Sequence, residues 1–259
     1  MQRLKELLQN IDGRGYKAYK VIRGSYDFGV MTLFIDHVQG DPFALPSRIR
    51  VRMEMSYAGI PRKFFATKIR KIATCDYLAR QFSQVIARLH RSRTGSGKSG
   101  LISIDSGAQE VLERASMRIE DNFVEARLEI GLPADGRRIL GMEASKILLD
   151  LVPKISDEAL RMERLDEKRM EEFVHCVENQ DSIRSQLESL GLCAFVANGS
   201  ILPRITGHKD EPMQSSVVPF KSPADFELSL DLPNPRSLDR KSTRLNSSHS
   251  SVSRMPSSA

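Results

Sequence analysis

Hydrophobic and polar residues alternate along the first half of the chain in a way that predicts both helices and strands. Residues 3–11 carry leucine and isoleucine at helical spacing, and residues 68–90 repeat that pattern over a longer stretch. Residues 30–38 predict a buried strand, and residues 48–54 alternate basic with apolar side chains, which is typical of a half-buried strand. This half is therefore expected to form a sheet with helices packed on it.

Short apolar runs predict more strands in the second half. They are residues 101–105, a hairpin of 116–120 and 123–131, and later runs at 192–197, 217–220 and 226–232. Hairpins and helices follow one another without regular β-α alternation. The order favours an α+β fold, with helices packed on a mixed, largely antiparallel sheet.

Helical spacing also recurs in the second half. Residues 137–151 predict a helix that Pro153 should end, because proline lacks the backbone N–H that the helix needs. Ser156 or Asp157 would then cap the next helix. Residues 166–190 predict a long helix closed by Gly191, and this helix could also face a partner subunit.

The last stretch, from Asp239, is serine-rich and has no apolar periodicity, so we expect residues 239–259 to be disordered. The segment DRKSTRLNSSH also resembles the translation of a sequencing-library adapter, and SRMPSSA resembles its continuation in another frame. We therefore expect the tail to be an artefact that follows a natural sequence reaching Leu238.

Composition is that of an ordinary soluble protein, with 40% hydrophobic and 28% charged residues among 259. No apolar run reaches bilayer length, and the start has no signal-peptide pattern. Three scattered cysteines, Cys75, Cys176 and Cys193, predict reduced thiols in a cytoplasmic protein and neither a disulfide framework nor a zinc site. The net charge is +6, but it falls to +3 without the tail, so charge alone does not indicate nucleic acid.

The run GSGKSG at 95–100 shares letters with the phosphate-binding loop of NTPases. That loop needs a glycine five positions before Gly97, where this chain has Ser92, and it must lie between a strand and a helix. Here a predicted helix comes before the run and a predicted strand after it, so an NTPase loop is rejected. Two interpretations stay open: a polar surface connection, or an anion-binding loop that uses Lys98 and backbone amides.

Seven motifs are distributed along the chain. They are IDGRGYKAYK at 11–20, GSYDF at 24–28, LFIDHVQGDPFALPSRIRV at 33–51, GSGKSGLISID at 95–105, QEVLER at 109–114, GLPADGRRILG at 131–141 and AFVANGSILPR at 194–204. Together they resemble the N-terminal region of the ATPases of the ABC class. The resemblance covers essentially residues 1–236, and it is the combination of motifs that is specific.

The resemblance implies a domain of residues 1–222 and the start of an ATPase domain at 223–238. It implies ATP and Mg²⁺ as cofactors of the parent protein, a C-terminal ATPase domain as partner, and a Walker A loop beyond the LPNP motif at 232–235. This chain would then be a non-catalytic part that shows no turnover alone. It also suggests that Lys98 and Ser99, both expected to be solvent-exposed on a mobile loop, contact phosphate or nucleotide.

A row of arginines is the strongest candidate for binding a polyanion. Arg48, Arg50 and Arg52 alternate along one strand, so their side chains leave the same face. Five nearby cations enlarge this surface, Arg62, Lys63, Lys68, Arg70 and Lys71, of which the last three are the candidates for contact with the polyanion. The face could bind the backbone of RNA or DNA, or it could be solvated or paired with carboxylates. A stand-alone nucleic-acid-binding module and a dimerising scaffold, forming a homodimer, are the alternative functions.

No catalytic or metal-binding group emerges from the sequence. Asp36 and His37 alternate to opposite faces of their strand, so they are not expected to share a metal with Asp41. A structural role of the carboxylates in the proline-bearing loop is the favoured interpretation.

Overall fold

A six-stranded sheet forms the centre of the protein. The computed structural model describes residues 1–90, 95–108, 110–201, 203–213 and 216–234. The strand order is β1-β2-β3-β6-β4, with β5 also paired to β6, and each pairing is antiparallel. The strands are β1 (Gly24–Asp27), β2 (Met31–His37), β3 (Ser47–Glu54), β4 (Ile102–Ser103), β5 (Met117–Ile119) and β6 (Phe123–Ile130).

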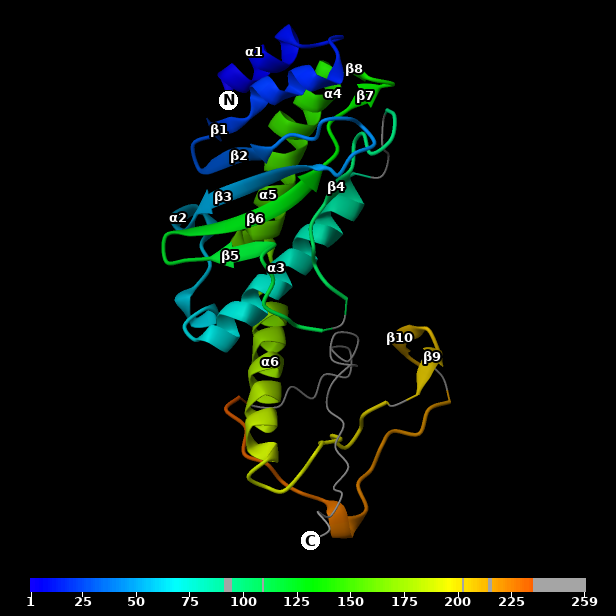
Figure 1. Ribbon diagram of the computed structural model, residues 1–259. Coiled ribbons are helices and arrows are strands. Elements are labelled where there is room, and N and C mark those ends of the chain that lie inside the picture. The colour runs from blue at the N-terminus through cyan, green and yellow to red at the C-terminus, as the bar shows by residue number, and fades with distance from the viewer. Residues whose placement is uncertain (91–94, 109, 202, 214–215, 235–259) are drawn as a thin grey trace.

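Helices pack on one face of this sheet, with α3 and α5 lying behind it in Figure 1. The α-helices are α1 (Gln2–Asn10), α2 (Met55–Ala58), α3 (Lys68–Leu89), α4 (Gly141–Ser145), α5 (Val152–Leu160) and α6 (Glu167–Leu187). Short helices of other types are η1 (Tyr16–Ile22), η2 (Arg62–Phe64), η3 (Lys146–Leu151), η4 (Met162–Arg164) and η5 (Ala224–Phe226). The predicted α+β class is confirmed.

The alternation that predicts β3 sets the two faces of the sheet. Ile49, Val51 and Met53 are buried in the core, while Arg48 is exposed and Arg50 and Arg52 are partly exposed. Strand β6 pairs with β3 along its whole length and repeats this pattern. One face therefore contributes to the core and the other presents charged side chains outward.

Capping residues explain where the two longest helices begin. The Thr67 side chain accepts a hydrogen bond from the backbone N–H of Arg70 at 3.3 Å, and Asp166 accepts one from Arg169 at 3.0 Å. After α6, Gly191 adopts a φ of +65°, a conformation that favours glycine, and the chain turns away. The predicted start of the helix at 166 is confirmed, but α6 ends at Leu187, three residues before the predicted end at 190, and Gly191 lies in the turn that follows.

The prediction that Pro153 ends a helix is wrong, since α4, η3 and α5 run on from Gly141 to Leu160. The π-type turn η3 ends at Leu151, two residues before the proline. Its wider backbone accommodates the missing N–H of Pro153 and the bulk of its ring. Ser156 does not cap a new helix; its hydroxyl donates to the Val152 carbonyl oxygen within the helix at 2.8 Å.

The three predicted late strands are also wrong, because residues 192–197, 217–220 and 226–232 contain no strand, and residue 226 ends the short helix η5. The regular structure there is a separate hairpin of β9 (Arg204–Thr206) and β10 (Lys209–Pro212), which pair antiparallel. A further hairpin, β7 (Ala134–Asp135) with β8 (Arg138–Ile139), precedes α4. Val218 is exposed, so the apolar residues of the late runs do not by themselves secure a place in the core.

Within the part of the chain that the structure describes, no helix combines the length and the apolar character needed to cross a bilayer. No disulfide joins Cys75, Cys176 and Cys193 among the described residues. The expected disordered tail, residues 239–259, lies outside the described residues, as do Thr94 of the glycine-rich loop and residues 235–238.

Candidate functional site

The glycine-rich loop packs closely against two other loops. The Ser96 amide donates to the Ala134 carbonyl oxygen, and the Lys98 amide donates to the Pro42 carbonyl oxygen, both at 2.8 Å. The Gly100 amide donates to the Gly131 carbonyl oxygen at 2.8 Å. Described residues 95–100 are thus fixed by hydrogen bonds, contrary to the prediction of a mobile connection.

Ser99 is buried, at 1% exposure, and the prediction that it is solvent-exposed is wrong. Its hydroxyl donates to the Ser96 carbonyl oxygen at 2.6 Å and accepts from the Ala134 amide at 3.1 Å. Lys98 is partly exposed. The sequence could not show this, because the partner of Ser99 lies 35 positions away in the chain.

This loop does not fit the phosphates of a nucleotide. A phosphate loop presents free amides at the start of a helix, whereas the amides of Ser96, Lys98 and Gly100 already donate to carbonyl oxygens. The element that follows is strand β4, not a helix. Phosphate contact by the Lys98 ammonium group stays a prediction.

We expect Ser99→Ala to destabilise the protein by about 1–3 kcal/mol, because the Ala134 amide would lose its acceptor in a buried position. Lys98→Ala should change the free energy of unfolding by no more than about 0.5 kcal/mol. Urea denaturation of both variants beside the wild type measures this. Equal losses in the free energy of unfolding would show that the Lys98 side chain stabilises the fold as much as the Ser99 hydroxyl does.

On the outer face of the sheet, Glu125 of β6 binds three arginines. Its side chain is 1% exposed. Its carboxylate accepts from Arg50 at 3.1 Å, from Arg52 at 2.7 Å and from Arg127 at 3.2 Å. Arg50 also makes a two-pronged contact with Asp36, at 2.6 and 2.8 Å. Arg50 and Arg52 are therefore paired with carboxylates, as one of the two interpretations of the arginine row expected.

The pKa values follow from these contacts. Burial alone would raise the pKa of Glu125, but hydrogen bonds from Arg52 and Arg127 and nearby arginine charge hold it below its ordinary value. The pKa of Asp36 is also lowered, chiefly by its hydrogen bonds with Arg50. Both groups are thus held as carboxylates. Arg48 is exposed, and the described residues give it no ion pair.

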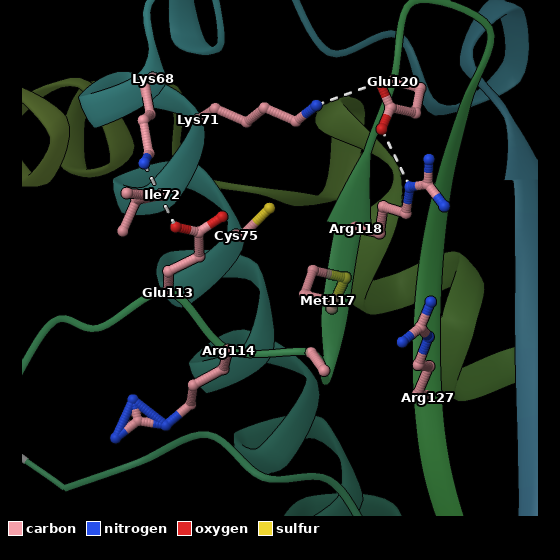
Figure 2. A pocket seen from close by; sticks show the side chains of 11 residues that line it. Lys68, Lys71, Ile72, Cys75, Glu113, Arg114, Met117, Arg118, Glu120 and Arg127 are labelled. Atoms are coloured by element: carbon pink, nitrogen blue, oxygen red, sulfur yellow. Dashed lines mark hydrogen bonds and ion pairs between the residues drawn. The ribbon is translucent and has the colours of Figure 1, made fainter.

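The other predicted cations are paired too. Lys71 contacts Glu120 at 3.0 Å and Lys68 contacts Glu113 at 3.7 Å. Figure 2 shows these side chains around a pocket of about 240 Å³ between α3 and β5. Each cation that lines the pocket has a carboxylate within 4.0 Å, so the structure distributes the charge of this surface among internal ion pairs.

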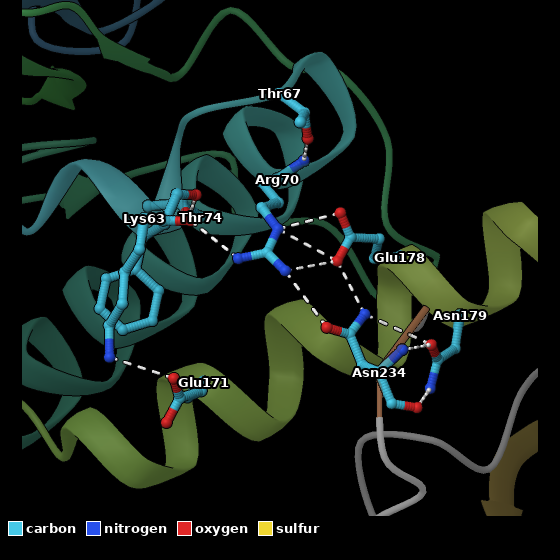
Figure 3. Close-up of polar contacts among 9 residues, drawn as sticks. Lys63, Thr67, Arg70, Thr74, Glu171, Glu178, Asn179 and Asn234 are labelled. Carbon is cyan, nitrogen blue, oxygen red and sulfur yellow. Dashed lines mark hydrogen bonds and ion pairs between the residues drawn. The ribbon is translucent and has the colours of Figure 1, made fainter. Parts of the chain in front are cut away.

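Arg70 lies in a different network, which joins two parts of the chain far apart in sequence. Its guanidinium donates to Glu178 of α6 at 2.7 Å and to the side-chain oxygen of Asn234 at 3.2 Å. Asn234 is buried and also donates to Glu178 at 2.7 Å. Figure 3 shows this network, in which the Asn234 backbone amide donates to Asn179 at 3.1 Å. The predicted cation is thus a structural link between α3, α6 and the segment at 234.

The remaining candidates do not form a reactive centre. In the described parts of the chain, no group of three or more His, Cys, Asp or Glu could hold a metal ion. Asp41 pairs with Arg137 at 3.1 Å, which agrees with a structural role in its loop. Burial raises the pKa of the Cys75 and Cys176 thiols to about 11, so neither is primed as a nucleophile.

Sequence reasoning missed two features of the protein, one on β6 and one around η1. Glu125 gave no signal, because its role depends on arginines that are distant in the chain. The second feature had a signal: Arg14, Lys17, Lys20 and Arg23 recur at every third position, and all four are exposed.

The fold defines an α+β protein, and the contacts of its described residues bring no catalytic group of side chains together. Residues 1–163 match the N-terminal region of the ATPases of the ABC class. Residues 166–239 match a P-loop domain of the ABC-class ATPases. Because the first match covers more than half of the chain, the protein belongs to the ABC-class ATPase family. No curated protein matches the chain.

The matches have consequences for the earlier predictions. P-loop ATPases in general use a nucleotide together with Mg²⁺. The two matched regions meet between residues 163 and 166, so α6 and Asn234 belong to the P-loop region while Arg70 belongs to the N-terminal region. The domain boundary expected at 222 stays a prediction.

Proposed function

We propose that this chain is a soluble, cytoplasmic part of an ABC-class ATPase that does not itself hydrolyse ATP. The ATPase as a whole would use ATP hydrolysis to act on nucleic acid. Family membership carries the ATPase half of this proposal. The geometry of the glycine-rich loop supports the non-hydrolysing half, because its amides are engaged with carbonyl oxygens and no helix start follows it.

A nucleic-acid substrate is supported by the distribution of charge. Along the outer face of the sheet and α3, most cations are neutralised by carboxylates, whereas another set of arginines and lysines near the N-terminus is exposed and has no ion pair among the described residues. Unpaired cations in a row attract a chain of phosphates more than a single small anion.

Phosphate release tests the catalytic half of the proposal. The purified 259-residue chain, supplied with Mg²⁺ and ATP, should release no phosphate above background, because the amides of Ser96, Lys98 and Gly100 already donate to carbonyl oxygens and are not available to a γ-phosphate. The Lys98→Ala variant is the matched control. Magnesium-dependent turnover that Lys98→Ala abolishes would show that the glycine-rich loop hydrolyses ATP, and the proposal would be wrong.

A further inference from the structure

The helix η1 carries its side chains in a strict three-residue repeat. Tyr16, Tyr19 and Ile22 are buried, and the two residues that follow the tyrosines, Lys17 and Lys20, are exposed. A 3₁₀ helix has three residues per turn, so side chains three apart lie above one another on one face. The buried and the charged residues therefore occupy separate sides of η1.

Two exposed arginines flank η1 at the same interval in the sequence. Arg14 lies two residues before its first residue, and Arg23 directly follows its last. We call these four residues the cationic row: Arg14, Lys17, Lys20 and Arg23. The rise of a 3₁₀ helix is about 2.0 Å per residue, so neighbouring charges within it are about 6 Å apart along its axis.

The row forms no ion pair with the described carboxylates, and Arg23 acts on Asp36 only through its charge, which lowers the pKa of that carboxyl. Within the described residues, no acidic group lies within 4.0 Å of any of its four cations, in contrast to Lys68, Arg70 and Lys71. Nearby Asp12 accepts from the Gly141 amide at 2.6 Å, and both oxygens of Asp36 accept from Arg50. One oxygen of Asp12 and both oxygens of Asp36 are thus engaged in other hydrogen bonds.

The row is also held rigidly. The Tyr16 hydroxyl donates to the Leu132 carbonyl oxygen at 3.0 Å, and the Tyr19 hydroxyl donates to that of Pro133 at 2.7 Å. The two rings pack edge to face with centroids 5.1 Å apart. These anchors fix a 3₁₀ helix longer than such helices usually are, so η1 presents its cations in a preformed arrangement.

We propose that the cationic row binds the phosphodiester backbone of a single-stranded nucleic acid. A linear row of positive charges at regular intervals matches a chain that repeats one negative charge per nucleotide. A membrane surface fits less well, because the apolar side of η1 is buried and held to residues 132–133, which lead into β7, so it is not free to enter lipid. This proposal rests on the proposed nucleic-acid function and gives it a site.

Salt dependence of binding tests the row. The full chain is titrated into a fluorescein-labelled oligouridylate between about 50 and 200 mM salt, where each phosphate contact to a single strand adds about 0.7 to the slope of log K against log salt. The row variant combines Arg14→Gln, Lys17→Gln, Lys20→Gln and Arg23→Gln. Its affinity should fall at least about tenfold at the lowest salt, and the slope of log K against log salt should fall by about 3.

A matched control removes the same charges elsewhere on the protein. It replaces two lysines and two arginines that are exposed and have no ion pair among the described residues, by Lys154→Gln, Arg169→Gln, Arg184→Gln and Lys221→Gln. The control should keep most of the affinity and slope. Equal losses in the two variants would overturn the row, because net charge alone would then explain binding.

The wild-type chain separates the failure of the row from the failure of the proposed nucleic-acid function. If it does not bind oligouridylate, or binds phosphatidylserine vesicles or polyglutamate more tightly, both proposals fail. If it binds and the row variant binds equally well, the row alone is overturned. If the row variant has a lowered melting temperature, the double variant Lys17→Gln, Lys20→Gln is used in its place. A fall of about 1.4 in the slope of log K against log salt supports the row, and an unchanged slope overturns it.

Discussion

Gly131→Ala is expected to destabilise the protein by about 3 kcal/mol or more, and to release the glycine-rich loop from its place. A Cβ atom at this position would lie 1.7 Å from the Lys98 carbonyl oxygen and 2.7 Å from its carbon. The two segments cannot simply move apart, because the Gly131 amide donates to Leu101 at 2.9 Å and the Gly131 carbonyl accepts from Gly100 at 2.8 Å. Chemical denaturation at 25 °C measures the loss.

Gly15→Ala is the control for this substitution. Gly15 has an ordinary φ of −63°, and nothing lies within 4 Å of a Cβ placed there. The control should change the free energy of unfolding by no more than about 0.5 kcal/mol. A Gly131→Ala protein as stable as the Gly15→Ala protein would mean that the two loops are not packed as described.

Glu125→Gln is expected to cost about 2–3 kcal/mol of stability at pH 7. Removing one partner of a fully buried ion pair costs about 3–5 kcal/mol, and the cost is smaller here because the three arginines are between 26% and 41% exposed. Glu129→Gln is the matched control, since Glu129 is exposed on the same face of β6, four residues beyond Glu125. The control should change stability by no more than about 0.5 kcal/mol.

The cost of Glu125→Gln should depend on pH in a defined direction. The pKa of Glu125 in the folded protein lies below its ordinary value of 4.5, so its charge stabilises the fold fully above that value. The stabilisation is lost as the pH falls through the lower, folded pKa. The difference between wild type and variant, measured by denaturation from pH 7 downwards, should therefore shrink only in the acid range. A difference that grows on acidification would contradict this account of Glu125.

Much of the fold could be predicted because its signals are local. The alternation of Ile49, Val51 and Met53 with arginines predicts β3 and its two faces, and the helical spacing at 68–90 predicts α3 within one residue at its C-terminal end. Pro153 misled the prediction because a π-type turn, which has no simple sequence signal, relieves the constraint that proline imposes.

The candidate site was harder to predict because it depends on contacts between distant segments. The sequence shows that Arg50 and Arg52 share a face, but only the pairing of β3 with β6 shows that Glu125 binds both. Ser99 was expected in solvent because polar, glycine-rich runs usually lie there, and the contact with Ala134 reverses this. The three-residue repeat of the cationic row is visible in the sequence, but its meaning required the 3₁₀ geometry of η1.

The network of Arg70, Glu178 and Asn234 has a thermodynamic consequence for the whole protein. It joins a residue of the N-terminal region to residues of the P-loop region through a buried asparagine. Consider one ligand that binds the N-terminal region and another that binds the P-loop region, each favouring either the formed or the broken network. The coupling free energy by which the first ligand changes the affinity for the second equals that by which the second changes the affinity for the first. Occupancy at one end of this protein and affinity at the other are therefore reciprocal quantities, to the extent that both ligands act on these three side chains.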